Sequence, residues 1–322
     1  MKFKHTFNVF IDNFTVTYKQ LLYRLIIALI TMGLTAAIVV PLVNGLTTSP
    51  YYILLMDGIK ALLQNILDGE LTNIGATTAQ IKEAFGALVN FVTEHFASIA
   101  WGVVGIVLIK LIANFFESLG NYATAAVIND RMALHAKSPF ILTLIRNLKE
   151  ACLYSLMYVP LSFLYDLVCL ALVYLIVFKL FALLPFMYLP IQVFIALTII
   201  VLAISVKMTL TSDWLPALIR GKTGQRKAFL YTFDRRKKNT LNVLSNFVVL
   251  VIIIFALNVA AILSTFGVGA LLTIPSSYVV LISFEFVNYY DREELKYFID
   301  KNTIIKPEKE RPLTREEFFK GE

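Results

Sequence analysis

A stripe of polar side chains interrupts one of the most apolar stretches of the chain. Lys110, Asn114, Glu117 and Asn121 follow one another at steps of four, three and four residues. On a helix, this spacing places all four side chains on one face. Charged side chains inside a membrane span are costly and usually face a partner or a polar pathway, so the stripe is a candidate functional site.

Two interpretations of the stripe follow from this cost. In the first, Lys110 pairs with Asp166, with Glu117 or with Glu285, and the polar side chains form a structural seam that fixes how the helices pack. In the second, the same residues line a pathway for an ion, a proton or a lipid headgroup. Glu285 is expected near the level of Glu117, where two carboxylates need a shared cation or a shared proton.

The composition explains why a membrane is the expected surrounding. Hydrophobic residues make up 58% of the 322 residues and charged residues 16%, whereas soluble domains carry about a quarter charged residues. A span needs roughly 20 apolar residues. This length predicts an all-α membrane domain over residues 1–290 with six transmembrane helices, at about residues 21–44, 98–117, 151–178, 182–206, 241–265 and 267–289.

The distribution of lysine and arginine predicts the orientation of these spans. Residues 1–24, 117–150, 207–240 and 291–322 hold 4, 4, 9 and 8 of them, which is 25 of 29. Cationic loops stay on the cytoplasmic side. We therefore expect a multi-pass protein of a bacterial cytoplasmic membrane with both termini in the cytoplasm.

An amphipathic stretch precedes the first, third and fifth spans and predicts three interfacial elbow helices on the cytoplasmic face. The last stretch is the most basic, and residues 207–240 carry nine cations and two acids, a net charge of 9 − 2 = +7. Anionic lipid headgroups are the expected partner and nucleic acid is not, although the run could act only as a topology determinant. The expected lipid contacts are Arg226, Lys227, Arg235, Arg236, Lys237 and Lys238, interleaved with the aromatic residues Phe229, Tyr231 and Phe233.

The segment between the first two spans, residues 46–97, predicts an external helical hairpin. One apolar stripe is formed by Leu55, Ile59, Leu62 and Ile66, and a second by Ile81, Phe85, Leu88, Val92 and Phe96. The hairpin is interpreted either as a lid on the bundle or as a cap that docks a membrane-protein partner or gates a substrate. Residues 291–322 are expected to form a solvated cytoplasmic tail, in which Phe318 and Phe319 could dock a partner.

The sequence holds no recognised catalytic or metal-binding pattern. His5, His95 and His135 lie far apart, and a helix would separate Cys152 from Cys169 by about 25 Å. No His-Glu-x-x-His, Gly-x-Ser-x-Gly or Walker pattern occurs. We therefore expect neither an enzyme nor a bound metal or cofactor.

One run of residues supports a resemblance to a known group. The run SDWLPALIRGKTGQRKAFLYTF at residues 212–233, together with three elbow-and-span units and an external extension, resembles a broad group of bacterial six-helix membrane proteins. The group includes the membrane domains attached to some glycerophosphodiester phosphodiesterases. The resemblance implies a fold and a membrane location. It implies no catalytic residue, because these 322 residues contain no counterpart of the soluble phosphodiesterase domain.

The sequence therefore favours a non-enzymatic membrane protein that interacts with lipids or belongs to a complex of the cell envelope. The alternative is a small transporter or channel that uses the polar residues around Lys110. A transporter needs a continuous polar cavity that reaches the middle of the membrane, whereas a scaffold needs polar residues that satisfy one another in a dry core.

Overall fold

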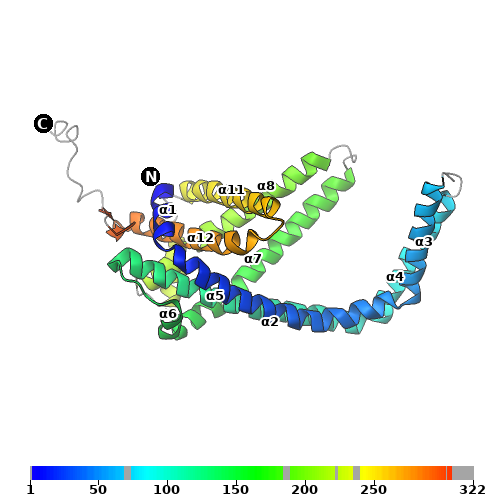
Figure 1. Ribbon diagram of the computed structural model, residues 1–322, viewed down its shortest axis with the longest axis horizontal. Coiled ribbons are helices and arrows are strands. Elements are labelled where there is room, and N and C mark those ends of the chain that lie inside the picture. The colour runs from blue at the N-terminus through cyan, green and yellow to red at the C-terminus, as the bar shows by residue number, and fades with distance from the viewer. Residues whose placement is uncertain are drawn as a thin grey trace. The chain divides into compact units, whose positions relative to one another are not determined.

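The computed structural model is all-α apart from one pair of two-residue strands. It describes residues 2–68, 74–183, 189–221, 224–234, 240–301 and 303–306. The helices, in chain order, are α1 (Lys2–Asp12), α2 (Phe14–Thr47), α3 (Pro50–Leu67), α4 (Ile74–Glu94), α5 (Phe96–Leu134), α6 (Phe140–Arg146), α7 (Leu148–Leu183), α8 (Leu189–Thr211), α9 (Trp214–Ile219), α10 (Gln225–Asp234), α11 (Thr240–Ser264) and α12 (Ala270–Arg292). The strands β1 (Tyr297–Phe298) and β2 (Ile304–Ile305) follow α12 (Figure 1).

Six helices in the described part of the chain are long and apolar enough to cross a membrane, namely α2, α5, α7, α8, α11 and α12. They correspond to the six predicted spans, which indicates a multi-pass membrane protein. Helix α5 differs most from its prediction, because it continues to Leu134, 134 − 117 = 17 residues beyond the predicted end. Its added residues, including Ala123 and Ile128, are buried in protein, so they remain helical although they are not needed to cross a membrane.

The chain divides into two compact units. The first contains residues 1–25 and 114–322, and the second contains residues 26–113. Residues that follow α12, such as Tyr297 and Ile299, are buried in the core of the first unit.

In the first unit, α12 is the most deeply buried span. Half of the residues in its most apolar 18-residue stretch are buried, whereas none are buried in the most apolar stretch of α2. Helix α1 packs on α12, where Phe3 stacks on Phe284 with ring centroids 5.6 Å apart and the Lys2 ammonium donates to Asn288 Oδ1 at 2.9 Å. Helix α8 packs against both α7 and α11, as Figure 1 shows. The expected first elbow is thus part of the packed bundle.

The bends between α1 and α2 and between α6 and α7 share one feature. Asn13 donates its side-chain amide to the carbonyl of Val9 at 2.8 Å, and Asn147 donates to the carbonyl of Thr143 at 3.0 Å. Asparagine side chains that bond the backbone compete with the regular helix ladder. Each short helix therefore ends one residue before an asparagine, and the long helix begins one residue after it.

An aromatic core holds the short helix α9, which sequence reasoning placed in a loop. Trp214 is 1% exposed and lies 5.3 Å from the Tyr154 ring and 4.8 Å from the Phe229 ring, between centroids. Six residues are too few to show a helical period, so the sequence pattern did not reveal α9. Its burial ties α10 to α7.

The residues after α12 fold back onto the first unit. Tyr297 pairs with Ile305 in the antiparallel strands, and both Tyr297 and Ile299 are buried in the main core. His5 Nδ1 lies 3.0 Å from the Tyr297 hydroxyl, which donates to Asp291 at 2.7 Å. The first part of the expected solvated tail is therefore packed, whereas Phe318 and Phe319 lie outside the described residues.

In the second unit, α3 and α4 pack along each other. A Cβ added at Gly58 would lie 3.1 Å from Ile81 Cγ1, so the two helices approach closely. The Tyr51 hydroxyl donates to Glu94 at 2.9 Å. This carboxylate raises the pKa of the Tyr51 phenol, because it accepts the hydrogen bond and repels the ionised form.

The face of α4 that meets α3 differs from the predicted stripe. Ala84 and Phe91 are buried, whereas Phe85, Val92 and Phe96 are exposed. Helix α4 is apolar on two faces, and Ile81 is the member of the predicted stripe that meets α3, where it lies against Gly58. The side chain of Leu88, also predicted for this stripe, lies outside the described part.

Candidate functional site

A cavity of about 180 Å³, here called the central cavity, lies between helices of the first unit. It gathers four residues of the predicted polar seam, Asn114 and Asn121 with Glu117 and Asp166. Two cations that sequence reasoning did not place in the seam, Arg24 and Lys207, also line it. The cavity therefore carries two positive and two negative side chains among apolar helices.

The Lys207 ammonium is the partner of Asp166. It lies 2.7 Å from both carboxylate oxygens, and the pair joins α8 to α7. Asp166 was one of three candidate partners of Lys110, and Lys207 takes that place instead. The side chain of Lys207 is 17% exposed and that of Asp166 is 53% exposed, so the lysine is the more enclosed partner. Nearby, the Tyr165 hydroxyl donates to the carbonyl of Ala203 at 2.7 Å and reinforces the same helix contact.

Arg24 is the second cation, and three groups hold its guanidinium. It donates to Asn121 Oδ1 at 2.9 Å, lies 3.7 Å from a Glu117 oxygen, and stands 3.5 Å over the centroid of the Tyr278 ring. Gln20 donates to the same Asn121 oxygen at 3.0 Å. Asn121 of the predicted stripe is thus the acceptor through which α5 binds α2.

Two buried polar groups accompany these charges. Glu285 of α12 lines a smaller cavity of about 70 Å³, to which Asn121 and Tyr158 also contribute. The Ser118 hydroxyl lines the central cavity, is buried, and has no hydrogen-bond partner among the described residues. Glu285 is therefore placed beside the seam, as a member of the adjoining cavity.

Lys110, which begins the predicted stripe, belongs to the second unit and is exposed. Within the described part of the chain, it forms no ion pair or side-chain hydrogen bond. The structure thus gathers five of the six seam residues in the first unit without Lys110.

Helix α10 carries the first part of the predicted lipid-contact run. Arg226 and Lys227 are exposed, and so are Leu230 and Phe233 of the same helix. Phe229 packs on Trp214 instead. The Tyr231 hydroxyl donates to Glu293. Arg235, Arg236, Lys237 and Lys238 lie outside the described residues.

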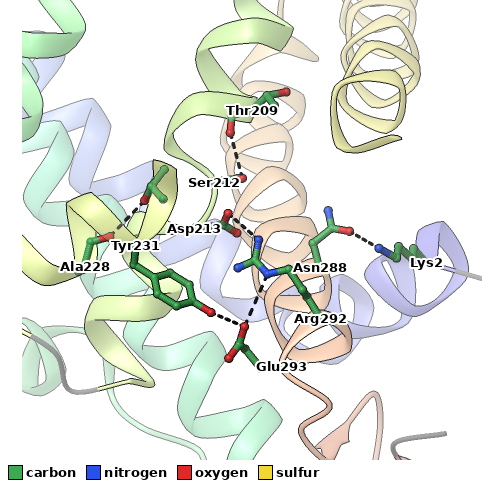
Figure 2. Close-up of polar contacts among 10 residues, drawn as sticks. Lys2, Thr209, Ser212, Asp213, Ala228, Tyr231, Asn288, Arg292 and Glu293 are labelled. Carbon is green, nitrogen blue, oxygen red and sulfur yellow. Dashed lines mark hydrogen bonds and ion pairs between the residues drawn. The ribbon is translucent and has the colours of Figure 1, made fainter. Parts of the chain in front are cut away.

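The end of α12 forms a polar cluster with its neighbours, which Figure 2 shows. Arg292 lies 2.7 Å from an Asp213 oxygen and 3.6 Å from a Glu293 oxygen. Asp213 belongs to the turn before α9, and Tyr231 of α10 reaches Glu293 from the other side (Figure 2). These contacts join α9, α10 and α12, and they have a structural role.

A second cavity was not foreseen from the sequence. It measures about 620 Å³, lies beside α5, α6 and α9, and is called here the α6–α9 cavity. Its charged lining residues are Asp130, Arg146, Glu150 and Arg220. The lining residues come from three separate stretches of the chain, 122–134, 146–150 and 218–224, and no spacing in the sequence brings these stretches together.

Comparison with known proteins identifies no relative: no protein-family model, no curated protein and no solved structure matches the chain. These comparisons do not support the resemblance to the phosphodiesterase-associated membrane domains. The six membrane-length helices are the part of that expectation that the structure shows.

Proposed function

We propose that the chain is a non-enzymatic multi-pass protein of a bacterial cytoplasmic membrane that interacts with lipids through the short helices α6 and α10. What supports the proposal is the exposed surface of these helices. Helix α6 exposes Ile141 and Ile145 beside Arg146, and α10 exposes Leu230 beside Arg226.

This combination suits the boundary between hydrocarbon and headgroups. Large apolar side chains bury area in the acyl region, while nearby cations attract anionic headgroups at about 1 kcal/mol each. In water, the same exposed apolar side chains would favour association with another molecule instead. Both helices lie immediately before a span in the sequence, where a headgroup layer is expected.

Lipid quenching of a fluorophore tests this proposal. In a background with Cys152→Ala and Cys169→Ala, single cysteines replace Ile145, Leu230 or Asp68 and are labelled with an environment-sensitive dye. Brominated lipids should quench the dye at 145 and 230 and leave it unchanged at 68, the exposed end of α3. Equal quenching at all three positions, or none at 145 and 230, would contradict the proposal.

The orientation is part of the same proposal, with both termini and α6 in the cytoplasm. An impermeant thiol reagent added to intact cells should label a cysteine at Asp68 and spare one at Lys149, because the lysine and arginine bias places them on opposite sides. The reverse labelling would invert the topology.

A transporter remains the second candidate function, and the central cavity favours it. A cavity with two cations and two carboxylates among apolar helices could pass an ion or a proton. A flux assay in proteoliposomes distinguishes the two functions. A transporter predicts flux that disappears in the double variant Lys207→Met/Asp166→Asn although the protein still folds, whereas a lipid-binding scaffold predicts no flux in either protein.

Membership of an envelope complex is compatible with the lipid interaction. The exposed residues Phe85 and Val92 of α4, with Phe96 at the start of α5, are the described surface for a membrane-protein partner. Replacing Phe85 and Val92 with serine should release such a partner in a cross-linking experiment in cells, while lipid quenching at position 145 stays unchanged.

A further inference from the structure

The α6–α9 cavity has the size and lining of a ligand site. Its volume of about 620 Å³ falls within the range of small-molecule sites, roughly 300–1,000 Å³. Polar and apolar side chains both contribute to its wall. The central cavity of the second candidate function shares no lining residue with it.

Two of its charges are only partly engaged by the protein. Asp130 accepts hydrogen bonds from Ser138 at 2.5 Å and from Arg146 at 3.4 Å. The charges of Asp130 and Arg146 therefore offset each other. Arg220 contacts the Tyr290 ring, with 5.7 Å from the guanidinium carbon to the centroid. The Glu150 carboxylate accepts one hydrogen bond, from the Tyr122 hydroxyl at 3.0 Å.

Arg220 and Glu150 are thus a cation and an anion at one cavity, and neither forms an ion pair with any described residue. Among the described lining residues, the charges sum to zero, with two cations and two anions. A ligand of zero net charge that carries both signs would satisfy Arg220 and Glu150 together. Arginine suits a phosphate, and a carboxylate suits an ammonium group that can donate hydrogen bonds.

The surroundings of the cavity indicate where such a ligand comes from. Leu134 lines the cavity and is 75% exposed, and α6, which supplies Arg146, exposes Ile141 and Ile145. If α6 lies in the headgroup layer, acyl chains can leave the cavity over these apolar residues. This step rests on the lipid interaction proposed above.

We propose that the α6–α9 cavity binds a phosphodiester that carries a primary ammonium group, the headgroup of phosphatidylethanolamine. Arg220 binds the phosphate, with Arg146 beside it, and Glu150 accepts hydrogen bonds from the ammonium. Phosphatidylcholine carries the same charges, but its quaternary ammonium has no N–H to donate. Phosphatidylglycerol lacks the cation and offers Glu150 no ammonium group.

The test is a titration of the full-length protein in detergent with short-chain forms of these three lipids, followed by calorimetry. The wild-type protein should bind the ethanolamine lipid more tightly than the other two by about tenfold or more. The reason is that the other two lipids cannot form the charge-assisted hydrogen bond between an ammonium N–H and Glu150. Equal affinity for the choline lipid, or tighter binding of the glycerol lipid, would overturn the proposal.

Two variants separate the roles of the two charges. Glu150→Gln should remove the preference for ethanolamine over choline, and Arg220→Gln should weaken binding of both lipids about tenfold. Lys149→Gln is the matched control, since Lys149 is exposed, adjoins Glu150 and does not line the cavity. Unchanged affinities in both cavity variants would overturn the site. Glu150 and Arg220 are exposed, so both variants should fold, and unchanged thermal unfolding checks this.

Soluble glycerophosphoethanolamine distinguishes the source of the ligand. Much weaker binding of this compound than of the lipid supports a membrane ligand, and equal binding supports the same headgroup site with a ligand from water. Loss of the ethanolamine preference while position 145 is still quenched overturns this site alone. Failure of both measurements overturns the proposed lipid interaction as well.

Discussion

The central cavity and the α6–α9 cavity carry the same number of charged side chains but engage them differently. Among the described residues, each is lined by two cations and two carboxylates. In the central cavity, Lys207 meets both oxygens of Asp166 at 2.7 Å, and three groups hold Arg24. In the α6–α9 cavity, Arg146 meets Asp130 only at 3.4 Å, and Arg220 contacts a ring.

The position of each cavity along the helices explains this difference. Asp166 and Lys207 interrupt apolar stretches of α7 and α8, where an unpaired charge is costly. Arg146 ends α6 and Arg220 follows α9, where water or headgroups can solvate a charge. Charges that pair with each other have a structural use, whereas charges left open at a cavity are available for a ligand.

The largest effect is expected from Lys207→Met, which strands the Asp166 carboxylate among apolar residues. We expect a loss of about 2–3 kcal/mol in the free energy of unfolding, as for a charge at the centre of a span. The double variant Lys207→Met/Asp166→Asn should recover most of the loss, because it leaves no stranded charge. Denaturant unfolding in micelles measures both. A double variant as unstable as the single one would break the comparison, since the pair would then not be a self-contained unit.

A second variant disturbs the central cavity without changing a charge. A Cβ at Gly120 would lie 2.5 Å from Tyr23 Cε1, so Gly120→Ala forces α2 away from α5 next to Arg24 and Asn121. The expected cost is about 2 kcal/mol, from overpacking. Gly33→Ala is the control, because nothing lies within 4 Å of its Cβ, and a helical Gly→Ala change can stabilise by up to about 1 kcal/mol. Similar thermal unfolding of the two variants would show that this contact does not position the cavity.

A smaller effect is expected from Arg24→Lys. Lysine keeps the charge but cannot serve Asn121, Glu117 and Tyr278 together, so the expected cost is about 1 kcal/mol. Arg146→Lys should cost nothing measurable, because Arg146 makes one long contact. Thermal unfolding of the two variants side by side checks the contrast, and equal losses would remove the distinction between the cavities.

Among the variants that remove a charge, the smallest effect on stability is expected from Arg146→Gln. The Arg146 side chain is 61% exposed, and its pair with Asp130 should contribute less than about 1 kcal/mol. Chemical denaturation measures the change. A loss as large as that of Lys207→Met would mean that the α6–α9 cavity is also held together by its own charges.

The spans and part of the seam could be predicted from the sequence. Apolar length alone located all six helices, and helical spacing placed Asn114, Glu117 and Asn121 on one face of α5, where they line one cavity. Asp166 was included in the predicted seam because few charged residues interrupt the third span. These features depend on distances along one helix, which a sequence fixes.

The partners of these residues could not be predicted in the same way. Arg24 and Lys207 stand at the ends of apolar runs, where they were counted as cytoplasmic loop charges. Helix α8 continues past Lys207 to Thr211. The one sign of this in the sequence is that the apolar residues Met208 and Leu210 follow Lys207. Which charge meets which depends on how the helices rotate and approach, and a single sequence does not determine that.

The direct test of the contrast between the cavities is native mass spectrometry of the protein purified from phosphatidylethanolamine-rich membranes. We expect that the wild-type protein and the double variant Lys207→Met/Asp166→Asn both retain a bound phosphatidylethanolamine, while Arg220→Gln loses it. Retention of the lipid by Arg220→Gln, or its loss from the double variant with Arg220 unchanged, would contradict the account.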